Sequence, residues 1–283
     1  MSNKHETEVV FIIGTGRSGT RSMFKMLSGT PDVEVYHEFV CTQVQKLAVE
    51  FSLGLVDKEE AKRQLHGLHF SGVYWSKAKL WIDCSNKLTW LIAPLIEIFP
   101  AAKFVNLVRD GRKVANSFVR KLGDEMYDDE SVAVMTAWLS NRDTFPTPPP
   151  EKKYWWNIPQ GSMPMANQFD QFDQFERAVY HWVEANRVAR ESLSRVVPQT
   201  QQLTLKLEDL TADRAVLARL CEFIGVPDDD SYWGALQRPE NVIFPMDARL
   251  TKQQEIQFKN LAADTMKYLG YDILSTEYSV DYK

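Results

Sequence analysis

The chain has 283 residues, of which 44% are hydrophobic and 25% are charged, and its formal net charge is −5. This composition is typical of a globular protein with a sizeable hydrophobic core. The net acidic charge makes sequence-independent nucleic-acid binding a poor candidate function, because that function needs a basic face.

The first forty residues predict a strand, a tight loop, a helix and a second strand. Residues 9–13 are a β-branched and aromatic run typical of a buried strand, and the glycines of residues 14–16 interrupt it. Apolar residues recur at helical spacing from residue 18, and the Gly-Thr-Pro of residues 29–31 ends that helix. Residues 33–36 predict the second strand. Such a β-α-β unit implies a parallel sheet.

The alternation of strand and helix patterns continues along the chain. Further strands are predicted at residues 80–83, 103–108 and 203–207. Helices are predicted at residues 40–55, 58–66, 88–99, 111–121, 131–143, 169–193, 213–224 and 251–269. Thr251 is expected to cap the start of the last helix and Gly270 its end. Together these elements predict an α/β fold with a central parallel β-sheet flanked by helices.

Residues 145–167 have a different composition from the rest of the chain. They contain six prolines and the pair Trp155-Trp156, without a consistent period. We interpret them as a long irregular Pro/Trp-rich insertion within the domain, because a linker rarely carries so many large aromatic residues.

The cysteines and the N-terminus bear on the compartment. Cys41, Cys84 and Cys221 are far apart and odd in number, so they predict free thiols rather than a disulfide framework or a zinc site. No metal site is expected. Residues 1–8 are polar and lack the apolar stretch of a signal peptide, and no apolar run reaches membrane-spanning length. We therefore expect a cytoplasmic protein without a membrane span.

The loop of residues 14–20, Gly-Thr-Gly-Arg-Ser-Gly-Thr, lies between the first strand and the first helix. Glycines allow the backbone to approach a ligand closely, and the N-terminus of a helix favours an anion. Arg17 adds a positive charge, and nearby hydroxyl groups add donors. The pattern predicts a phosphate-binding loop, although a glycine-rich turn that only joins two elements is the alternative.

Two other nucleotide loops fit this segment less well. In the ATPase and kinase pattern, Thr20 stands where the lysine is expected and Arg21 where the metal-binding hydroxyl is expected. The dinucleotide pattern G-x-G-x-x-G matches by letter, but Glu34 and Glu38 come too early to be its ribose-binding acid.

A second candidate anion site follows the strand predicted at residues 103–108. Arg109 comes at the carboxyl end of this strand, where α/β proteins bind ligands, and Ser117 follows about two helical turns later. An arginine fork and a hydroxyl can together hold a phosphate. A surface arginine and an unrelated helical serine are the alternative.

These motifs resemble those of the sulfotransferases that use 3′-phosphoadenosine 5′-phosphosulfate (PAPS). Residues 14–20 resemble the 5′-phosphosulfate loop of that family, and residues 104–117 resemble its 3′-phosphate motif, including the arginine-to-serine spacing. Residues 205–210 are similar to a strand and turn found late in these proteins, and residues 269–271 to a common ending. The resemblance extends in order from about residue 9 to residue 271.

The resemblance implies a single α/β domain over residues 1–283, related to the P-loop nucleoside-triphosphate hydrolases. It implies PAPS as the co-substrate, without a metal, and Arg17 as the contact to the bridging oxygen of the donor. The donor-binding residues that it implies are Gly16, Arg17, Ser18, Gly19, Thr20, Arg21, Ser22, Arg109 and Ser117. One feature departs from the family: Arg21-Ser22-Met23 occupy the stretch where an aromatic often stacks on the adenine.

A sulfuryl acceptor must lose a proton as it attacks sulfur, so a general base is expected near the donor. His37 and Glu38 follow the second strand, and family members use a histidine or a glutamate as base. Adjacent residues on an extended chain point in opposite directions, so only one of the two is expected to face the site. The resemblance favours Glu38, with His37 as the alternate, because many bacterial-type members carry a glutamate after this strand.

The expected acceptor is a small molecule or a carbohydrate that offers a hydroxyl or an amine. The aromatic residues Tyr154, Trp155 and Trp156 either line the acceptor site or pack into the core. A P-loop kinase of a small molecule and a non-catalytic nucleotide-binding protein on the same fold are the alternative functions.

Overall fold

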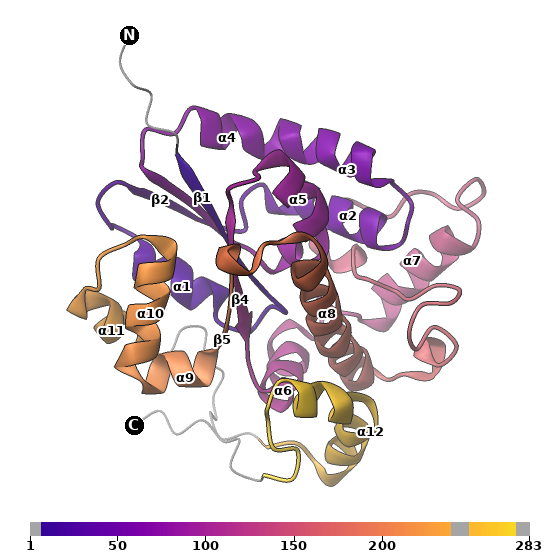
Figure 1. The fold of residues 1–283 in the computed structure, drawn as a ribbon. Helices are drawn as coiled ribbons and strands as arrows, with labels where there is room; N and C mark the ends of the chain where they lie inside the picture. Colours follow the sequence, from indigo (N-terminus) through magenta and orange to yellow (C-terminus); the bar gives the residue numbers. More distant parts are fainter. Residues whose placement is uncertain (1–6, 239–248, 276–283) are drawn as a thin grey trace.

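Five parallel strands form the central sheet, in the order β2-β3-β1-β4-β5. The computed structural model describes residues 7–238 and 249–275 (Figure 1). The strands are β1 (Glu8–Gly14), β2 (Val33–His37), β3 (Leu80–Cys84), β4 (Lys103–Val108) and β5 (Gln202–Lys206). The strand β3 lies between β1 and β2. The predicted α/β fold with a central parallel sheet flanked by helices is confirmed.

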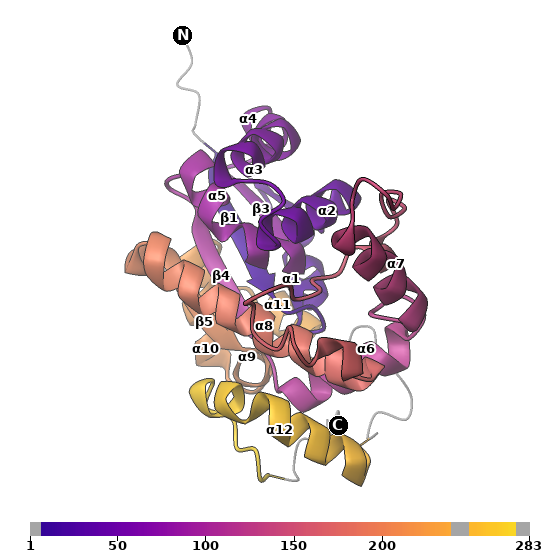
Figure 2. The same ribbon diagram turned by 90° about the vertical axis from the view of Figure 1, so that its right-hand side faces the viewer.

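Helices cover both faces of the sheet (Figures 1 and 2). One face is covered by α1 (Thr20–Leu27), α9 (Leu207–Ala212), α10 (Arg214–Ile224) and α11 (Asp230–Leu236). The other is covered by α2 (Cys41–Ser52), α3 (Lys58–Leu65), α4 (Ser71–Tyr74), α5 (Ile92–Ile98) and the inner side of α8 (Gln174–Val196). The central strand is therefore apolar on both sides: Val10 and Ile12 face the first group of helices, and Phe11 and Ile13 the second.

A third apolar cluster extends the molecule beyond the carboxyl edge of the sheet. It joins α6 (Gly111–Leu122), α7 (Asp129–Ser140) and α12 (Lys252–Tyr268) to the outer side of α8. The irregular segment at residues 145–167 contributes Trp155 and Trp156, which are 1% and 7% exposed. Both indoles therefore pack in the core, and both also line the small pocket described below, so neither of the two roles expected for them is excluded.

The starts of the two longest helices are set by capping boxes. Asp173 caps α8 together with Glu176, so the helix begins at Gln174 and not at residue 169 as expected. Phe169 and Phe172 are buried in the core from a short 3-10 turn ahead of it. Thr251 caps α12 as predicted, and Gly270 follows its end with φ +70°.

Other differences from the expected elements are local. The helix expected at residues 88–99 consists of a 3-10 turn (Asn86–Leu91) and α5. The helices α9 and α11 were not predicted, nor was the π-helical turn His66–Phe70 that leads into α4. The segment 145–167 is irregular, as expected, apart from the 3-10 turn Lys152–Tyr154.

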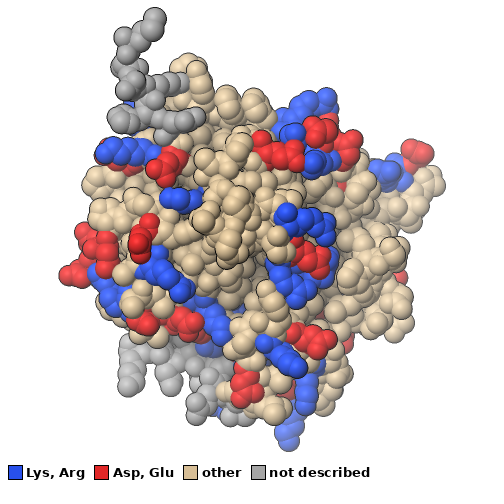
Figure 3. Space-filling view, in the orientation of Figure 1, with Lys and Arg blue, Asp and Glu red and all other residues tan. Residues whose placement is uncertain are grey.

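The cysteines, the candidate membrane spans, the candidate metal ligands and the surface charge were also predicted or examined from the sequence, and the structure bears on each. The three cysteines are free thiols, as predicted. Within residues 7–238 and 249–275, no helix combines the length and the hydrophobicity needed to cross a membrane, and no three His, Cys, Asp or Glu side chains gather as metal ligands. Basic and acidic side chains are interspersed on the face shown in Figure 3. The expectation for residues 1–6 lies outside the described residues.

Candidate active site

The segments that follow four strands meet at the carboxyl edge of the sheet. They are the loop after β1, the turn after β2 that holds His37 and Glu38, residues 85–87 after β3, and the turn after β4 that begins with Arg109. Ligands of open α/β sheets bind at this edge. The fold therefore brings both predicted anion sites and both candidate bases to one end of the sheet.

The loop after β1 is forced into a compact shape. Gly16, Arg17 and Gly19 all have positive φ, at +77°, +55° and +109°. A Cβ on Gly16 would contact the side chain of Asn86, and a Cβ on Gly19 would lie 2.8 Å from Leu207. The helix α1 begins at Thr20, so the loop leads directly into a helix N-terminus. Both glycines are thus required by backbone conformation and by space.

The side chains of the loop differ in burial and in hydrogen bonding. Ser18 is fully buried, and its Oγ has no hydrogen-bond partner within the described part of the chain. Thr20 is buried, Ser22 is half-buried and Arg21 is exposed. An unsatisfied hydroxyl and a cradle without Cβ atoms are the features expected of a site for an oxyanion.

Arg17 and Arg109 are in direct contact. Nη1 of Arg109 donates to the carbonyl oxygen of Arg17 at 2.8 Å, and Nε of Arg17 donates to Oγ of Ser117 at 2.8 Å. Burial, followed by the positive charges of Arg109 and Arg21, lowers the pKa of Arg17 to about 10. Arg17 still carries its charge at neutral pH. The two predicted anion sites thus form one continuous basic region, and Ser117 lies against Arg17.

Glu38 is held between two lysines. Its Oε2 lies 2.6 Å from Nζ of Lys152 and accepts from the thiol of Cys41 at 3.2 Å. Burial alone would raise the pKa of this carboxyl. The ammonium groups of Lys87 and Lys152 outweigh that effect and lower the pKa to about 2. Glu38 is therefore a carboxylate across the physiological pH range.

His37 lies in a different environment. Its ring packs against Phe24 of α1 with a centroid distance of 5.9 Å. Burial lowers the pKa of His37 below its ordinary value. The negative charge of Glu38 raises this pKa and the positive charge of Arg21 lowers it, but both effects are smaller than that of burial. Whereas Glu38 contacts Cys41 of α2 and Lys152, His37 contacts α1, on the opposite side of the sheet.

The turn that carries Glu38 is strained and anchored. Both Glu38 and Val40 have left-handed backbone conformations, with φ of +56° and +44°. Between them, the amide of Phe39 donates to Oδ1 of the fully buried Asp83 at 3.2 Å. Oδ2 of Asp83 lies 3.4 Å from Nε2 of His69. This buried pair holds the turn in place.

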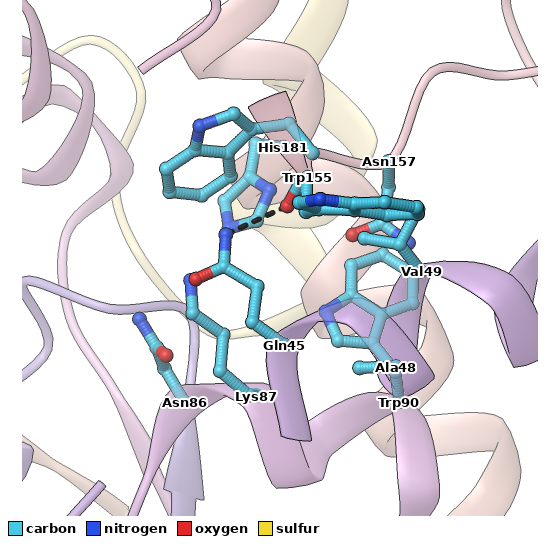
Figure 4. Close-up of a pocket in the computed structure, with 10 residues that line it drawn as sticks. Gln45, Ala48, Val49, Asn86, Lys87, Trp90, Trp155, Asn157 and His181 are labelled. Carbon is cyan, nitrogen blue, oxygen red and sulfur yellow. Dashed lines mark hydrogen bonds between the residues drawn. The ribbon is translucent and has the colours of Figure 1, made fainter. Parts of the chain in front are cut away.

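A small pocket adjoins Glu38 and the loop (Figure 4). Its lining comes from α2, the 3-10 turn that follows β3, the segment 145–167 and α8, and it has room for about one water molecule. In Figure 4, Gln45 reaches across it and donates to the carbonyl of Trp155 at 2.6 Å. His181, on α8, lies with Nε2 at 3.2 Å from the carbonyl oxygen of Thr15. Burial lowers the pKa of His181 to about 3, so its ring is neutral and donates to the loop.

Lys87 is the side chain of this pocket that the sequence analysis missed. It is 7% exposed, and burial lowers its pKa. Its Nζ lies 4.2 Å from the ring centroid of Trp156, and the charge of nearby Glu38 raises its pKa without offsetting the larger effect of burial. Its position three residues after β3, at the same edge as the loop, was the available signal.

Part of the chain is similar to a known protein family. A family model described as "Sulfotransferase family" matches residues 9–145. A search of curated protein sequences finds no significant match.

Several solved structures are similar to the chain. The sulfotransferase domain of the Synechococcus PCC 7002 olefin synthase is 16% identical, with 96% of this chain and 98% of that chain covered and a TM-score of 0.47. A mouse sulfotransferase complexed with PAP is 13% identical, with 93% and 84% covered and a TM-score of 0.46. A Mycobacterium avium sulfotransferase is 12% identical, with 94% and 78% covered and a TM-score of 0.48.

The match over residues 9–145 contains the loop after β1, the turn with Glu38, and Arg109 with Ser117. Residues 9–145 of the chain are therefore similar to the sulfotransferase family.

Proposed function

We propose that this protein transfers the sulfuryl group of PAPS to a hydroxyl or an amine of a small-molecule or carbohydrate acceptor. One observation carries the proposal: Arg109 contacts the backbone of Arg17 at 2.8 Å, while the guanidinium of Arg17 contacts Ser117. A basic region that is continuous between the two motifs suits a nucleotide with phosphate groups at both ends. The single domain over residues 1–283 and the cytoplasmic location remain parts of this proposal.

The donor fits the residues at the carboxyl edge. Gly16, Ser18, Gly19, Thr20, Arg21 and Ser22 would hold the 5′-phosphosulfate, with the buried hydroxyl of Ser18 as an unused hydrogen-bonding group. Arg109 and Ser117 would hold the 3′-phosphate. No metal ligand is needed in this assignment, because Arg17, Arg109 and Arg21 supply the positive charge.

The transfer follows from these assignments. The acceptor oxygen or nitrogen attacks sulfur, the bond between sulfur and the bridging oxygen of the 5′-phosphate breaks, and the acceptor proton passes to Glu38. The products are the sulfated acceptor and adenosine 3′,5′-bisphosphate. Arg17 would stabilise the charge that develops on the bridging oxygen, a role that can contribute about 3 kcal/mol. Lys87 would add a second positive charge beside Glu38.

Calorimetric titration with adenosine 3′,5′-bisphosphate tests the donor assignment. We expect saturable binding that does not require magnesium, and at least tenfold weaker binding by Arg109→Ala. Arg120→Ala is the matched control, since Arg120 lies on the same helix, α6, outside the assigned site. Binding of ATP that depends on magnesium would favour a kinase instead. Bisphosphate binding without turnover on any acceptor would favour a non-catalytic protein.

A further inference from the structure

Behind Arg109, a row of hydrogen bonds connects the turn after β4 to the last described residues. The carbonyl oxygen of Arg109 accepts from Nε1 of Trp182 at 3.1 Å. The amide of the next residue, Asp110, donates to Oε1 of Glu208 at 3.1 Å. The peptide that follows Arg109 is therefore held from two sides, by α8 and by the start of α9.

Glu208 uses both of its carboxylate oxygens. While Oε1 accepts from Asp110, Oε2 accepts from the hydroxyl of Tyr271 at 2.9 Å. Burial and the neighbouring charge of Glu208 raise the pKa of Tyr271, so the phenol keeps its proton and remains a donor. Tyr271 lies 63 residues after Glu208, and the two belong to the late segments that resemble family motifs.

The segment that carries Tyr271 is fastened on both sides of this contact. Nζ of Lys206 donates to the carbonyl of Gly270 at 2.8 Å and lies 4.4 Å from the ring centroid of Tyr271. Arg112 pairs with Asp110 through two hydrogen bonds of 3.0 and 2.6 Å, and it also donates to the carbonyl of Asp272 at 3.1 Å. The chain beyond α12 and the turn at Arg109 thus form one hydrogen-bonded unit.

We propose that Glu208 and Tyr271 are positioning residues that aim the guanidinium of Arg109 at the 3′-phosphate of the donor. The inference rests on the proposed function. An arginine side chain has many rotamers, and ordering it on binding costs entropy. When the peptide behind Arg109 is already fixed, less of the motion of this residue remains to be lost when the guanidinium binds an anion. Neither Glu208 nor Tyr271 needs to touch the nucleotide, since both act through the amide of Asp110.

The test compares two nucleotides that differ only in the 3′-phosphate. Adenosine 3′,5′-bisphosphate and adenosine 5′-monophosphate are titrated into wild type, Tyr271→Phe, Glu208→Ala and Glu208→Gln. We expect Tyr271→Phe to weaken bisphosphate binding about fivefold and Glu208→Ala about tenfold, with monophosphate affinity unchanged. Glu208→Gln retains an oxygen that can accept from Asp110, so it should restore most of the affinity lost in Glu208→Ala.

Tyr268→Phe is the matched control. It removes the same hydroxyl from a tyrosine three residues earlier, which is exposed and stacks on Arg190 at 4.5 Å. Its bisphosphate affinity should equal that of wild type.

The outcomes separate this inference from the donor assignment. If wild type does not prefer the bisphosphate over the monophosphate, the donor assignment fails and the positioning role fails with it. If wild type shows that preference, but Tyr271→Phe and Glu208→Ala retain it in full or weaken both nucleotides equally, only the positioning role is overturned.

Discussion

The ammonium of Lys152 lies 2.6 Å from Oε2 of Glu38. The two residues are 114 positions apart, and Lys152 belongs to the irregular Pro/Trp-rich segment. A general base is most effective when its pKa is near the working pH, whereas the pKa of Glu38 is lowered to about 2. Together with Lys87, the irregular segment therefore lowers the basicity of the candidate base through Lys152.

Replacing Lys152 by methionine should raise the pKa of Glu38. A neighbouring opposite charge depresses a carboxyl pKa, so its removal shifts the acid limb of the kcat/KM profile upward by about one pH unit. The ion pair stabilises the fold above pH 4.5, the ordinary pKa of the carboxyl, and this contribution is lost as the pH falls towards 2. Lys152→Met should therefore have a lower free energy of unfolding than wild type at neutral pH. Its free energy of unfolding should also fall less than that of wild type when the pH is lowered.

Lys153→Met is the control for this change. Lys153 pairs at 3.0 Å with the exposed Glu130 and makes no contact with Glu38. Its acid limb should match that of wild type. An acid limb that does not move in Lys152→Met would show that another group titrates.

Glu38→Gln tests the identity of the base. The amide keeps the shape of the side chain but cannot accept the acceptor proton, so turnover should fall by about 10²- to 10⁴-fold. Binding of adenosine 3′,5′-bisphosphate should remain close to that of wild type, measured by calorimetry. His37→Gln is the comparison, and it should keep most of the turnover because His37 packs against α1. The reverse pattern would assign the base to His37.

Gly16→Ala should disrupt the phosphate loop. Its φ of +77° is strained for alanine, and the added Cβ would contact Asn86 and lie 3.0 Å from the ring of Phe118. Gly54→Ala is a matched control, because Gly54 also has a positive φ, +68°, but nothing lies within 4 Å of the added Cβ. Both variants should lose about 1 kcal/mol of stability or more through the backbone. Only Gly16→Ala should also lose affinity for adenosine 3′,5′-bisphosphate; equal affinities would contradict a cradling role for this loop.

Local patterns were enough to predict the sheet and the phosphate loop. The buried run in β1, the glycines and the following helix are all adjacent in sequence, and Arg109 is placed by the end of its own strand. The start of α8 was also readable, since Asp173 and Glu176 have capping-box spacing. It was displaced in the prediction because Phe169 and Phe172 continue the apolar pattern without being helical in α8.

The parts that sequence could not predict depend on contacts between distant segments. Lys152 reaches Glu38, and Ser117 reaches Arg17 across 100 residues, although its spacing suggested a partnership with Arg109. Composition also could not separate a ligand wall from core at Trp155 and Trp156, because a buried indole and a stacking indole have the same sequence signature. These contacts exist only after the helices have packed.

Because His181 is buried, its protonation should make the free energy of unfolding depend on pH. Its pKa is lowered to about 3 by burial and the charge of Lys87, while the unfolded chain binds a proton near pH 6.5. Between these values the unfolded state holds more protons, so the free energy of unfolding falls as the pH drops, by up to about 1.4 kcal/mol per unit. Urea unfolding at pH 7 and pH 5 should therefore show a smaller pH difference for His181→Gln than for wild type. His66→Gln removes an exposed histidine that stacks on Phe70, and it should leave the difference unchanged. An identical pH difference in wild type and His181→Gln would mean that the ring is protonated in the folded protein, and that its contact with the Thr15 carbonyl does not require the neutral form.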